Sequence, residues 1–199
     1  LKLIILLKNI KFTNNMLYGT IYGDIAGSMY EFRSVKDYNF TSVPKGSHFT
    51  DDTVMTLAIA KWLMNDGWGD EGLVEAMQEM GRAYPKAGYG GMFRKWLASE
   101  NPKPYNSFGN GSAMRVAPCA WIADTLATAE ALAKVSAEVT HNHPEGIKGA
   151  QAVAAAIWMA KEDYDKCEIK EYITKTYGYN LNRTIQEIKD SGYKFDVSC

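Results

Sequence analysis

The segment SHFTDDTVMTLAIAKWL, residues 47–63, carries a hydroxyl and two adjacent carboxylates directly before a long apolar run. Thr50, Asp51 and Asp52 offer several oxygen atoms, which are the ligands that Mg²⁺ and Mn²⁺ prefer. The same residues suit the start of a helix, because an N-cap Thr or Asp accepts free helix N–H groups and first-turn acids suit the helix dipole. A helix cap and a hard-cation site therefore both stay open, and the second needs further ligands from other segments and water.

The segment YGDIAGSMYEF, residues 22–32, contains a second set of acids. Gly23 and Gly27 lie four residues apart on one helical face, which permits close backbone approach. Asp24 and Glu31 are two helical turns apart, so both side chains can point the same way. The alternative is a tightly packed helix with exposed acids, which on this segment alone is favoured.

The segment NSFGNGSAMRVAP, residues 106–118, has the composition of an anion-binding turn before a helix. Gly109 and Gly111 let the backbone turn tightly and direct N–H groups inward, which predicts a phosphate cradle. It has neither the GK[ST] ending of a Walker A loop nor a GxGxxG pattern. An ordinary turn capped by Asn110 or Ser112 stays an equal alternative.

The remaining polar and aromatic candidates favour structural roles on their own. His141 and His143 in VTHNHPEGIKGAQAVA are two residues apart, so they cannot share a helical face, and no further His lies nearby to complete a zinc set. A histidine pair at a Pro-initiated helix start is more typical of capping than of catalysis. The aromatic residues of YPKAGYGGMFRKWL are likewise more typical of a core than of a ligand platform.

The elements that must position these residues are helices, because apolar residues mostly recur at helical spacing. Two of the segments are rich in Ala, so their helices can approach each other closely. Strand candidates are few and short, the main one lying before Met16. We predict an all-α fold with a compact multi-helix core, and helices over 16–32, 53–64, 69–83, 90–99, 111–124, 128–140, 144–161, 166–176 and 181–190.

Composition indicates one ordinary globular domain of 199 residues, with 46% hydrophobic and 23% charged residues. Lys plus Arg number 22 against 23 for Asp plus Glu, which leaves no basic surface to recruit nucleic acid or an anionic membrane. Three cysteines without CxxC spacing favour free thiols, a reducing compartment and hence a cytoplasmic protein. The apolar stretch at the start is shorter than the roughly 20 residues that span a bilayer. We expect residues 1–15 to be an extension outside the core and residues 16–199 to form the domain.

Five segments in this order resemble the ADP-ribosylglycohydrolase family: GDIAGSMYE, FTDDT, YPKAGYGGMFRKWL, SFGNGSAMR and THNHPEGIKGA. The resemblance runs from about Met16 to Cys199. It implies a compact, orthogonally packed all-α domain with two divalent cations, Mg²⁺ or Mn²⁺, at the bottom of a cleft. The implied reaction is hydrolysis of the N- or O-glycosidic bond between ADP-ribose and an acceptor on a protein or small molecule.

The resemblance also implies roles for individual residues. Thr50, Asp51 and Asp52 match the amino-terminal metal ligands, and Glu31 matches an acid beside the metals and the substrate ribose. Glu31 or Asp52 is then the group that accepts a proton from the attacking water. The implied substrate-binding residues are Tyr89, Gly90, Ser107, Phe108, Gly109, Asn110, Ser112 and His141.

The sequence departs from the family at its carboxyl-terminal end. Relatives carry a second metal motif resembling GGD[ST]DT, and no segment of this sequence matches it. We therefore expect a carboxyl-terminally incomplete domain in which the two-metal site and the activity are impaired. Absent helices are expected to expose apolar faces and favour self-association.

Two other functions stay open at this point. The domain is alternatively a non-catalytic binder of ADP-ribose or a nucleotide, or a structural helical scaffold. No motif fixes the acceptor, which is an Arg, a Ser or another group, and oxygen ligands suit Mg²⁺ and Mn²⁺ equally.

Overall fold

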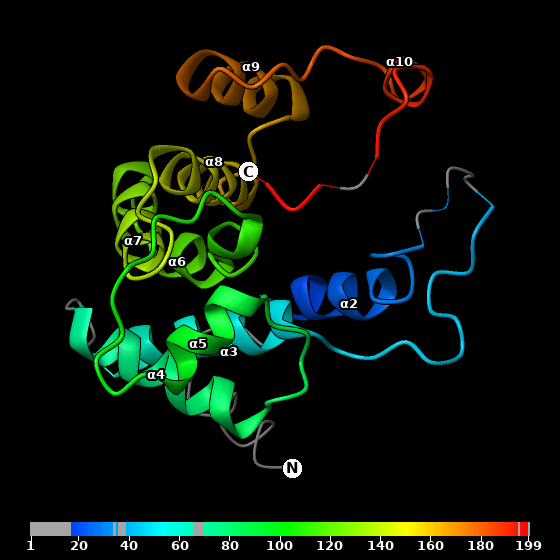
Figure 1. Cartoon of the computed structure of the whole chain (residues 1–199). Coiled ribbons are helices and arrows are strands. Elements are labelled where there is room, and N and C mark those ends of the chain that lie inside the picture. The colour runs from blue at the N-terminus through cyan, green and yellow to red at the C-terminus, as the bar shows by residue number, and fades with distance from the viewer. Residues whose placement is uncertain (1–16, 34, 36–38, 66–69, 195, 199) are drawn as a thin grey trace.

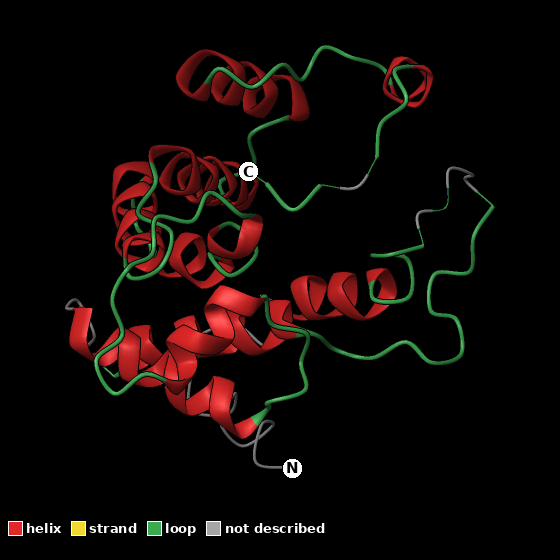
Figure 2. Ribbon diagram, viewed as in Figure 1, coloured by secondary structure: helices red, strands yellow, loops and turns green. Residues whose placement is uncertain are grey.

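The computed structural model describes residues 17–33, 35, 39–65, 70–194 and 196–198. Within these ranges the regular structure is helical and no strand is formed (Figure 2), apart from an isolated antiparallel bridge between Gly109 and Ser198. The all-α prediction is therefore confirmed. The expected extension at 1–15 and the strand candidate before Met16 lie outside the described residues.

The helices follow one another along the chain, and the long connections among them are the one between α2 and α3 and the one between α5 and η1 (Figure 1). Their bounds are α2 (Tyr18–Gly27), α3 (Asp51–Met64), α4 (Asp70–Ala83), α5 (Gly91–Ala98), the 3₁₀ turn η1 (Asn110–Ser112), α6 (Ala117–Ile122), α7 (Leu126–Glu138), α8 (Pro144–Lys161), α9 (Lys166–Tyr177) and α10 (Ile185–Asp190).

Helix α3 lies at the centre of the core. Every residue from Thr53 to Ala60 is buried, so this helix is enclosed on all sides rather than along a single apolar stripe. It packs against α2, α4 and α6. Because the middle of the helix is enclosed in this way, the acids at its amino-terminal end are held in a fixed position.

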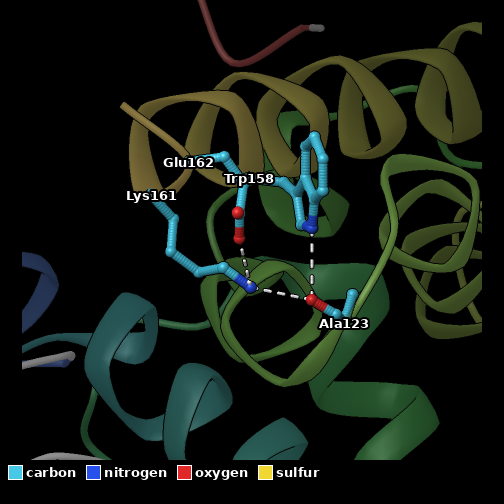
Figure 3. Close-up of polar contacts among 4 residues, drawn as sticks. All are labelled: Ala123, Trp158, Lys161 and Glu162. Atoms are coloured by element: carbon cyan, nitrogen blue, oxygen red, sulfur yellow. Dashed lines mark hydrogen bonds and ion pairs between the residues drawn. The ribbon is translucent and has the colours of Figure 1, made fainter. Parts of the chain in front are cut away.

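Helices α6, α7 and α8 form a second group beside α3 (Figure 1). The expected close approach of the Ala-rich segments is confirmed, because Ala129 and Ala133 of α7 and Ala150 and Ala154 of α8 are fully buried in one core. At the other end of α8, the carbonyl of Ala123 accepts hydrogen bonds from Trp158 Nε1 at 3.1 Å and Lys161 Nζ at 2.7 Å (Figure 3). These contacts fix the end of α6 on α8.

Three of the predicted helices are clearly shorter than the sequence pattern indicated, and the one expected over 181–190 begins only at Ile185, after the cap Thr184. The segment predicted as a helix over 111–124 divides into η1 and α6, because Pro118 lacks an N–H and is tolerated only in the first turn of a helix, where α6 places it. Helix α2 ends at Gly27 and is followed by a turn in which Tyr30 N donates to Gly27 O. The close backbone approach expected at Gly23 and Gly27 is wrong, since a Cβ at either position would meet no atom within 4 Å.

Two general expectations can be compared with the described part of the chain. None of the helices there is long and apolar enough to cross a membrane. Cys119 and Cys167 are free thiols, one buried and one exposed, as the cysteine pattern predicted.

Candidate functional site

A cavity of about 290 Å³ lies where the amino-terminal end of α3 meets three loops. One wall is formed by Glu31, Asp51 and Asp52, and the opposite wall by the glycine-rich segment 107–111 together with His141. Its volume is close to the lower limit of ordinary small-molecule sites. The predicted residues that line it are Glu31, Asp51, Asp52, Gly90, Ser107, Gly109, Asn110 and His141.

The acidic wall begins with Thr50, which is the N-cap of α3, and its side chain accepts a hydrogen bond from Asp52 N at 3.3 Å. Asp24 of α2 holds this helix start from the other side. Its carboxylate accepts from Thr50 N at 2.8 Å, Thr50 Oγ1 at 2.6 Å, Thr53 N at 3.2 Å and Thr53 Oγ1 at 2.5 Å. Asp24 therefore supplies an acceptor to both backbone and side chains of the first turn, which is the usual need of a helix amino terminus.

The acids around this helix start repel one another electrostatically. Burial, followed by the charge of Asp52, raises the pKa of Asp51 to about 7. Burial and the charges of Asp24 and Glu31 raise the pKa of Asp52 to about 6, although the hydrogen bond from Thr50 opposes this. The pKa of Glu31 is also raised, by burial and by the charge of Asp24. A cation placed here would lower all of these pKa values.

These oxygens suit a hard cation in type, and they provide part of a coordination shell. Among the described residues, no three side chains of His, Cys, Asp or Glu gather closely enough to hold a metal ion by themselves. The hydroxyl of Thr50 adds an oxygen ligand at the same place, since its hydrogen points to Asp24 and one lone pair is left beside the one that accepts from Asp52 N. The donor set therefore fits a cation whose remaining ligands are water or other groups.

The loop between α4 and α5 comes close to Asp51. Gly88 has φ +110°, and a Cβ there would lie 3.2 Å from Asp51 Oδ1, so a glycine is needed on both grounds. The next residue, Tyr89, is 2% exposed and packs against Phe93 with ring centroids 5.6 Å apart. Its hydroxyl makes no hydrogen bond with the described residues, and burial and the charge of Asp51 raise its pKa. An unpartnered donor thus lies near the acidic wall.

The opposite wall is a loop held tightly onto the start of α8. Ser112 Oγ donates to Gly146 O at 2.7 Å, and a Cβ at Gly146 would lie 2.7 Å from Ser107 O. Within the loop, Gly109 N donates to Ser107 Oγ at 3.1 Å. Asn110 N donates to Val197 O at 2.7 Å, so the segment before Ser198 lies against this wall. Only glycine at 146 allows the loop and helix to approach this closely.

Behind this wall, His141 is 5% exposed and contacts a buried polar cluster. Its Nδ1 lies 2.7 Å from Thr140 Oγ1, which in turn accepts from Arg115 Nη2 at 2.9 Å. Burial and the charge of Arg115 lower the pKa of His141 to about 3, so the ring is neutral at pH 7. Burial also lowers the pKa of Arg115 to about 10, which leaves it charged at that pH.

Four predicted site residues do not line the cavity. Thr50 and Ser112 are buried just behind it and bind its walls. Tyr89 is buried beside the acidic wall, whereas Phe108 is 55% exposed and meets the ring of His143 edge to face at 5.5 Å. His143 itself is the N-cap of α8 and accepts from Glu145 N, as the histidine spacing predicted.

Other residues of the site were missed by the sequence interpretation. Asp24 was noted only for sharing a helical face with Glu31, which lies beyond the end of α2, and Arg115 stood in a quoted motif without a role. Each acts on a residue more than twenty positions away in the chain. Their only sequence signal is that each is a charged residue inside a glycine-containing segment. The other cavity-lining residues that were not predicted are Phe32, Met55, Gly88, Phe93, Gly111, Met114 and Val197.

Comparison with known proteins identifies related chains. Residues 13–193 match the family described as ADP-ribosylglycohydrolase. The chain is 30% identical to human ADP-ribosylhydrolase ARH3 over 190 residues, which cover 76% of this chain and 50% of the relative. It is 30% identical to the mouse ADP-ribosylhydrolase ARH3 over 188 residues, covering 76% and 50%, and 28% identical to the one from Gallus gallus over 178 residues, covering 72% and 48%. The chain thus spans about half the length of the curated relatives it matches.

Proposed function

Because the chain belongs to the ADP-ribosylglycohydrolase family, we propose that it is a glycohydrolase that releases ADP-ribose from an acceptor. The observation that carries the proposal is the cavity, in which carboxylates at the start of α3 face a glycine-rich loop and His141. Such a pairing suits a ligand with ribose hydroxyls at one end and a diphosphate at the other. The proposed substrate is a protein with an ADP-ribosylated side chain or a small molecule that contains ADP-ribose.

We propose that Thr50, Asp51 and Asp52 hold divalent cations, Mg²⁺ or Mn²⁺, as two ions in the complete site. The raised pKa values of Asp51 and Asp52 support this, because desolvated acids that repel each other gain from a cation. When bound, such ions would orient hydroxyl groups and make a water more acidic. With only part of the shell supplied by the described residues, we expect weak cation binding.

Glu31 and Asp52 are the proposed general bases. Both line the cavity, and the pKa of each carboxyl is raised, that of Asp52 to about 6. A carboxylate with a pKa near the working pH accepts a proton more effectively than one with an ordinary value. Asp24 acts indirectly, because it holds Thr50 and thereby the first turn of α3.

The segment from Ser107 to Asn110 is the proposed binding site for the diphosphate. Backbone N–H groups in glycine-rich turns form concave surfaces for anions, and a diphosphate bound here would replace Ser107 Oγ and Val197 O as the acceptors of Gly109 N and Asn110 N. Gly90 lines the opposite side, and Phe108 presents an exposed ring at the rim. The buried positions of Tyr89 and Ser112 support roles in shaping the walls, with His141 as the proposed polar contact.

The direct test is hydrolysis by the whole chain. Peptides ADP-ribosylated on Arg or on Ser are incubated with the protein in the presence of Mg²⁺, Mn²⁺ or EDTA. Released ADP-ribose is measured by chromatography. Because the cation site of this chain is expected to be impaired, we expect slow release at high cation concentration, none in EDTA, and none from Asp51→Asn. Release that is equal in wild type and Asp51→Asn, or no release from either peptide, would contradict the proposed activity.

A second candidate function is a binder of ADP-ribose without catalysis. It is favoured by the loop wall, which is held by Gly146 and Ser112 and does not depend on the acids. Calorimetry with ADP-ribose in EDTA separates the two functions. Binding without cations, together with no hydrolysis in the presence of cations, would favour the binder.

The cytoplasmic location and self-association remain proposals. Free Cys119 and Cys167 are compatible with a reducing compartment. Several aromatic residues of α2 and the turn after it are exposed, including Tyr18, Tyr22 and Phe32. Sedimentation velocity over a concentration series tests self-association, and a constant sedimentation coefficient would contradict it.

A further inference from the structure

A buried arginine without an acidic partner lies behind the loop wall of the cavity. Arg115 is 1% exposed, and its Nη2 donates to Ser136 O at 2.5 Å and to Thr140 Oγ1 at 2.9 Å. Among the described residues no carboxylate forms an ion pair with it, and its electrostatic neighbours are Tyr105 and Cys119. The buried charge of Arg115, which costs free energy to desolvate, therefore binds and orients two uncharged oxygens.

The hydroxyl of Thr140 connects this arginine to His141. Its oxygen accepts from Arg115, and two acceptors compete for its single hydrogen. Ala137 O lies 3.5 Å away, at the limit of a hydrogen bond, whereas His141 Nδ1 lies at 2.7 Å, the usual O–H distance. If Nδ1 carried the ring hydrogen, the hydroxyl would have only the long contact left. The distances therefore assign Thr140 as donor and Nδ1 as acceptor.

The other ring nitrogen of His141 faces the glycine-rich loop. A Cβ at Gly111 would lie 3.0 Å from Nε2, and a Cβ at Gly109 would lie 3.8 Å from it. Nε2 forms no hydrogen bond with the described residues, and His141 lines the cavity. Because Nδ1 is an acceptor in a neutral ring, Nε2 carries the hydrogen.

We propose that Arg115 and Thr140 are positioning residues that place the ring hydrogen of His141 on Nε2, so that the cavity wall presents an N–H donor beside Gly109–Gly111. Its ligand is an acceptor oxygen of an anionic group such as a diphosphate; this second half rests on the proposed function, whereas the position of the hydrogen does not. The low pKa of His141 supports the proposal, because only a neutral ring has a single ring hydrogen to place; a charged ring carries one on each nitrogen. Outer hydrogen bonds commonly select a histidine tautomer in this way.

The first experiment measures the position of the hydrogen in the wild-type chain. Long-range ¹H–¹⁵N correlation spectra of the protein with ¹⁵N-labelled histidine report each ring, and the chain has three histidines. Single His→Gln variants at positions 48 and 143 assign the signals. We expect hydrogen on Nε2 and a hydrogen-bonded Nδ1 for His141 at pH 7. Hydrogen on Nδ1, or a charged ring, would overturn the proposal.

The second experiment removes the hydroxyl. Thr140→Val keeps the shape of the side chain, and we expect the Nδ1 resonance to move to the position of an unbonded nitrogen, with some of the other tautomer. Thr140→Ser keeps the hydroxyl and should restore the wild-type spectrum. Thr56→Val is the matched control, because Thr56 is equally buried and its hydroxyl bonds Met114 O instead. An unchanged Nδ1 resonance in Thr140→Val would overturn the role of Thr140. If that variant does not fold, the wild-type spectrum still decides the position of the hydrogen, and Thr140→Ala replaces Thr140→Val as the test of the hydroxyl.

The third experiment tests the ligand. Calorimetry with ADP-ribose should give binding about tenfold weaker for Thr140→Val than for wild type or Thr140→Ser, the cost of one misplaced hydrogen bond. Equal affinity in Thr140→Val would overturn the role of the donor in binding. Absence of binding by the wild type would overturn the proposed function and this half of the proposal, while the spectra judge the tautomer independently.

Discussion

On one wall of the cavity Asp51 and Asp52 lie beside Glu31, and the pKa values of all three carboxyl groups are raised. Behind the other wall Arg115 is a single buried cation. Among the described residues no positive charge approaches these acids, and burial further disfavours their charged forms. The arginine also lacks an acidic partner, but oxygens of Ser136 and Thr140 accept its hydrogens.

This difference shows that the two walls are prepared for a ligand in different ways. The loop wall is already satisfied internally, so its geometry is set before anything binds. The acidic wall is held in place by Asp24 but is electrostatically unfavourable, so it gains most from an added cation. We therefore expect substitutions behind the loop wall and of Asp24 to lower stability, and neutral substitutions of Asp51 or Asp52 to raise it when no cation is bound.

The largest expected effect is from Arg115→Ala. The change leaves Ser136 O and Thr140 Oγ1 without their donor and opens a cavity, which should lower the free energy of unfolding by about 4 kcal/mol. Urea denaturation followed by circular dichroism measures it. Arg94→Ala, at an exposed position of α5, is the control and should change stability by less than about 0.5 kcal/mol. A loss under 1 kcal/mol would remove the claim that Arg115 organises this wall.

Asp24→Ala should have the next largest effect. Four donors of Thr50 and Thr53 lose their acceptor, and relief of the repulsion with Asp52 offsets part of this, so we expect a loss of about 2 kcal/mol. Thermal unfolding measures the loss, with Asp124→Ala as an exposed control of the same charge change. If Asp24→Ala were as stable as wild type, the first turn of α3 would not depend on α2.

Without cations, Asp51→Asn should raise the free energy of unfolding, whereas the two preceding substitutions lower it. The pKa of Asp51 in the folded protein, about 7, is above its ordinary value of 3.8, so its favourable contribution is complete below pH 3.8 and is lost as pH rises toward 7. Wild type should therefore lose stability between about pH 4 and pH 7, and the variant should be more stable at pH 8 by about 2 kcal/mol.

Unfolding in urea at several pH values in EDTA measures this difference. Addition of Mg²⁺ at pH 8 should raise the melting temperature of wild type more than that of Asp51→Asn. Parallel pH profiles for the two proteins would show that Asp51 is not the group responsible.

The smallest expected effect separates the two histidines. His143→Ala removes the cap of α8 and should cost about 0.5–1 kcal/mol, with ADP-ribose affinity unchanged because His143 does not line the cavity. His141→Ala should instead weaken binding of ADP-ribose. Calorimetry on both variants checks this, and equal affinity losses would erase the distinction between a capping and a cavity-lining histidine.

Local sequence patterns predicted the helices well because the forces that begin and end them act over a few residues. Thr50 and His143 cap their helices through backbone groups two residues away, and both were recognisable from the residues that follow. The error at 111–124 had a local cause too, since Pro118 was visible in the sequence and a helix running through it should have been rejected.

The site was predictable only in part, because its chemistry depends on contacts between distant segments. Asp51 and Asp52 could be selected from their own neighbourhood, but nothing near Asp24 in the sequence shows that it accepts hydrogens from residues 26 and 29 positions later. Arg115 and Thr140 are likewise 25 residues apart. Roles that rest on such pairs require the packed structure.

The sequence by itself determined an all-α chain, the cap at Thr50, the acids that follow it and the glycine-rich turn, because propensity, periodicity and capping are local properties. Only the tertiary structure decided that these segments enclose one cavity, that Asp24 holds α3, and that His141 is linked to Arg115. The physical reason is that burial and charge at a side chain are set by everything packed around it. The pKa of Asp51 near 7 and that of His141 near 3 are products of that environment.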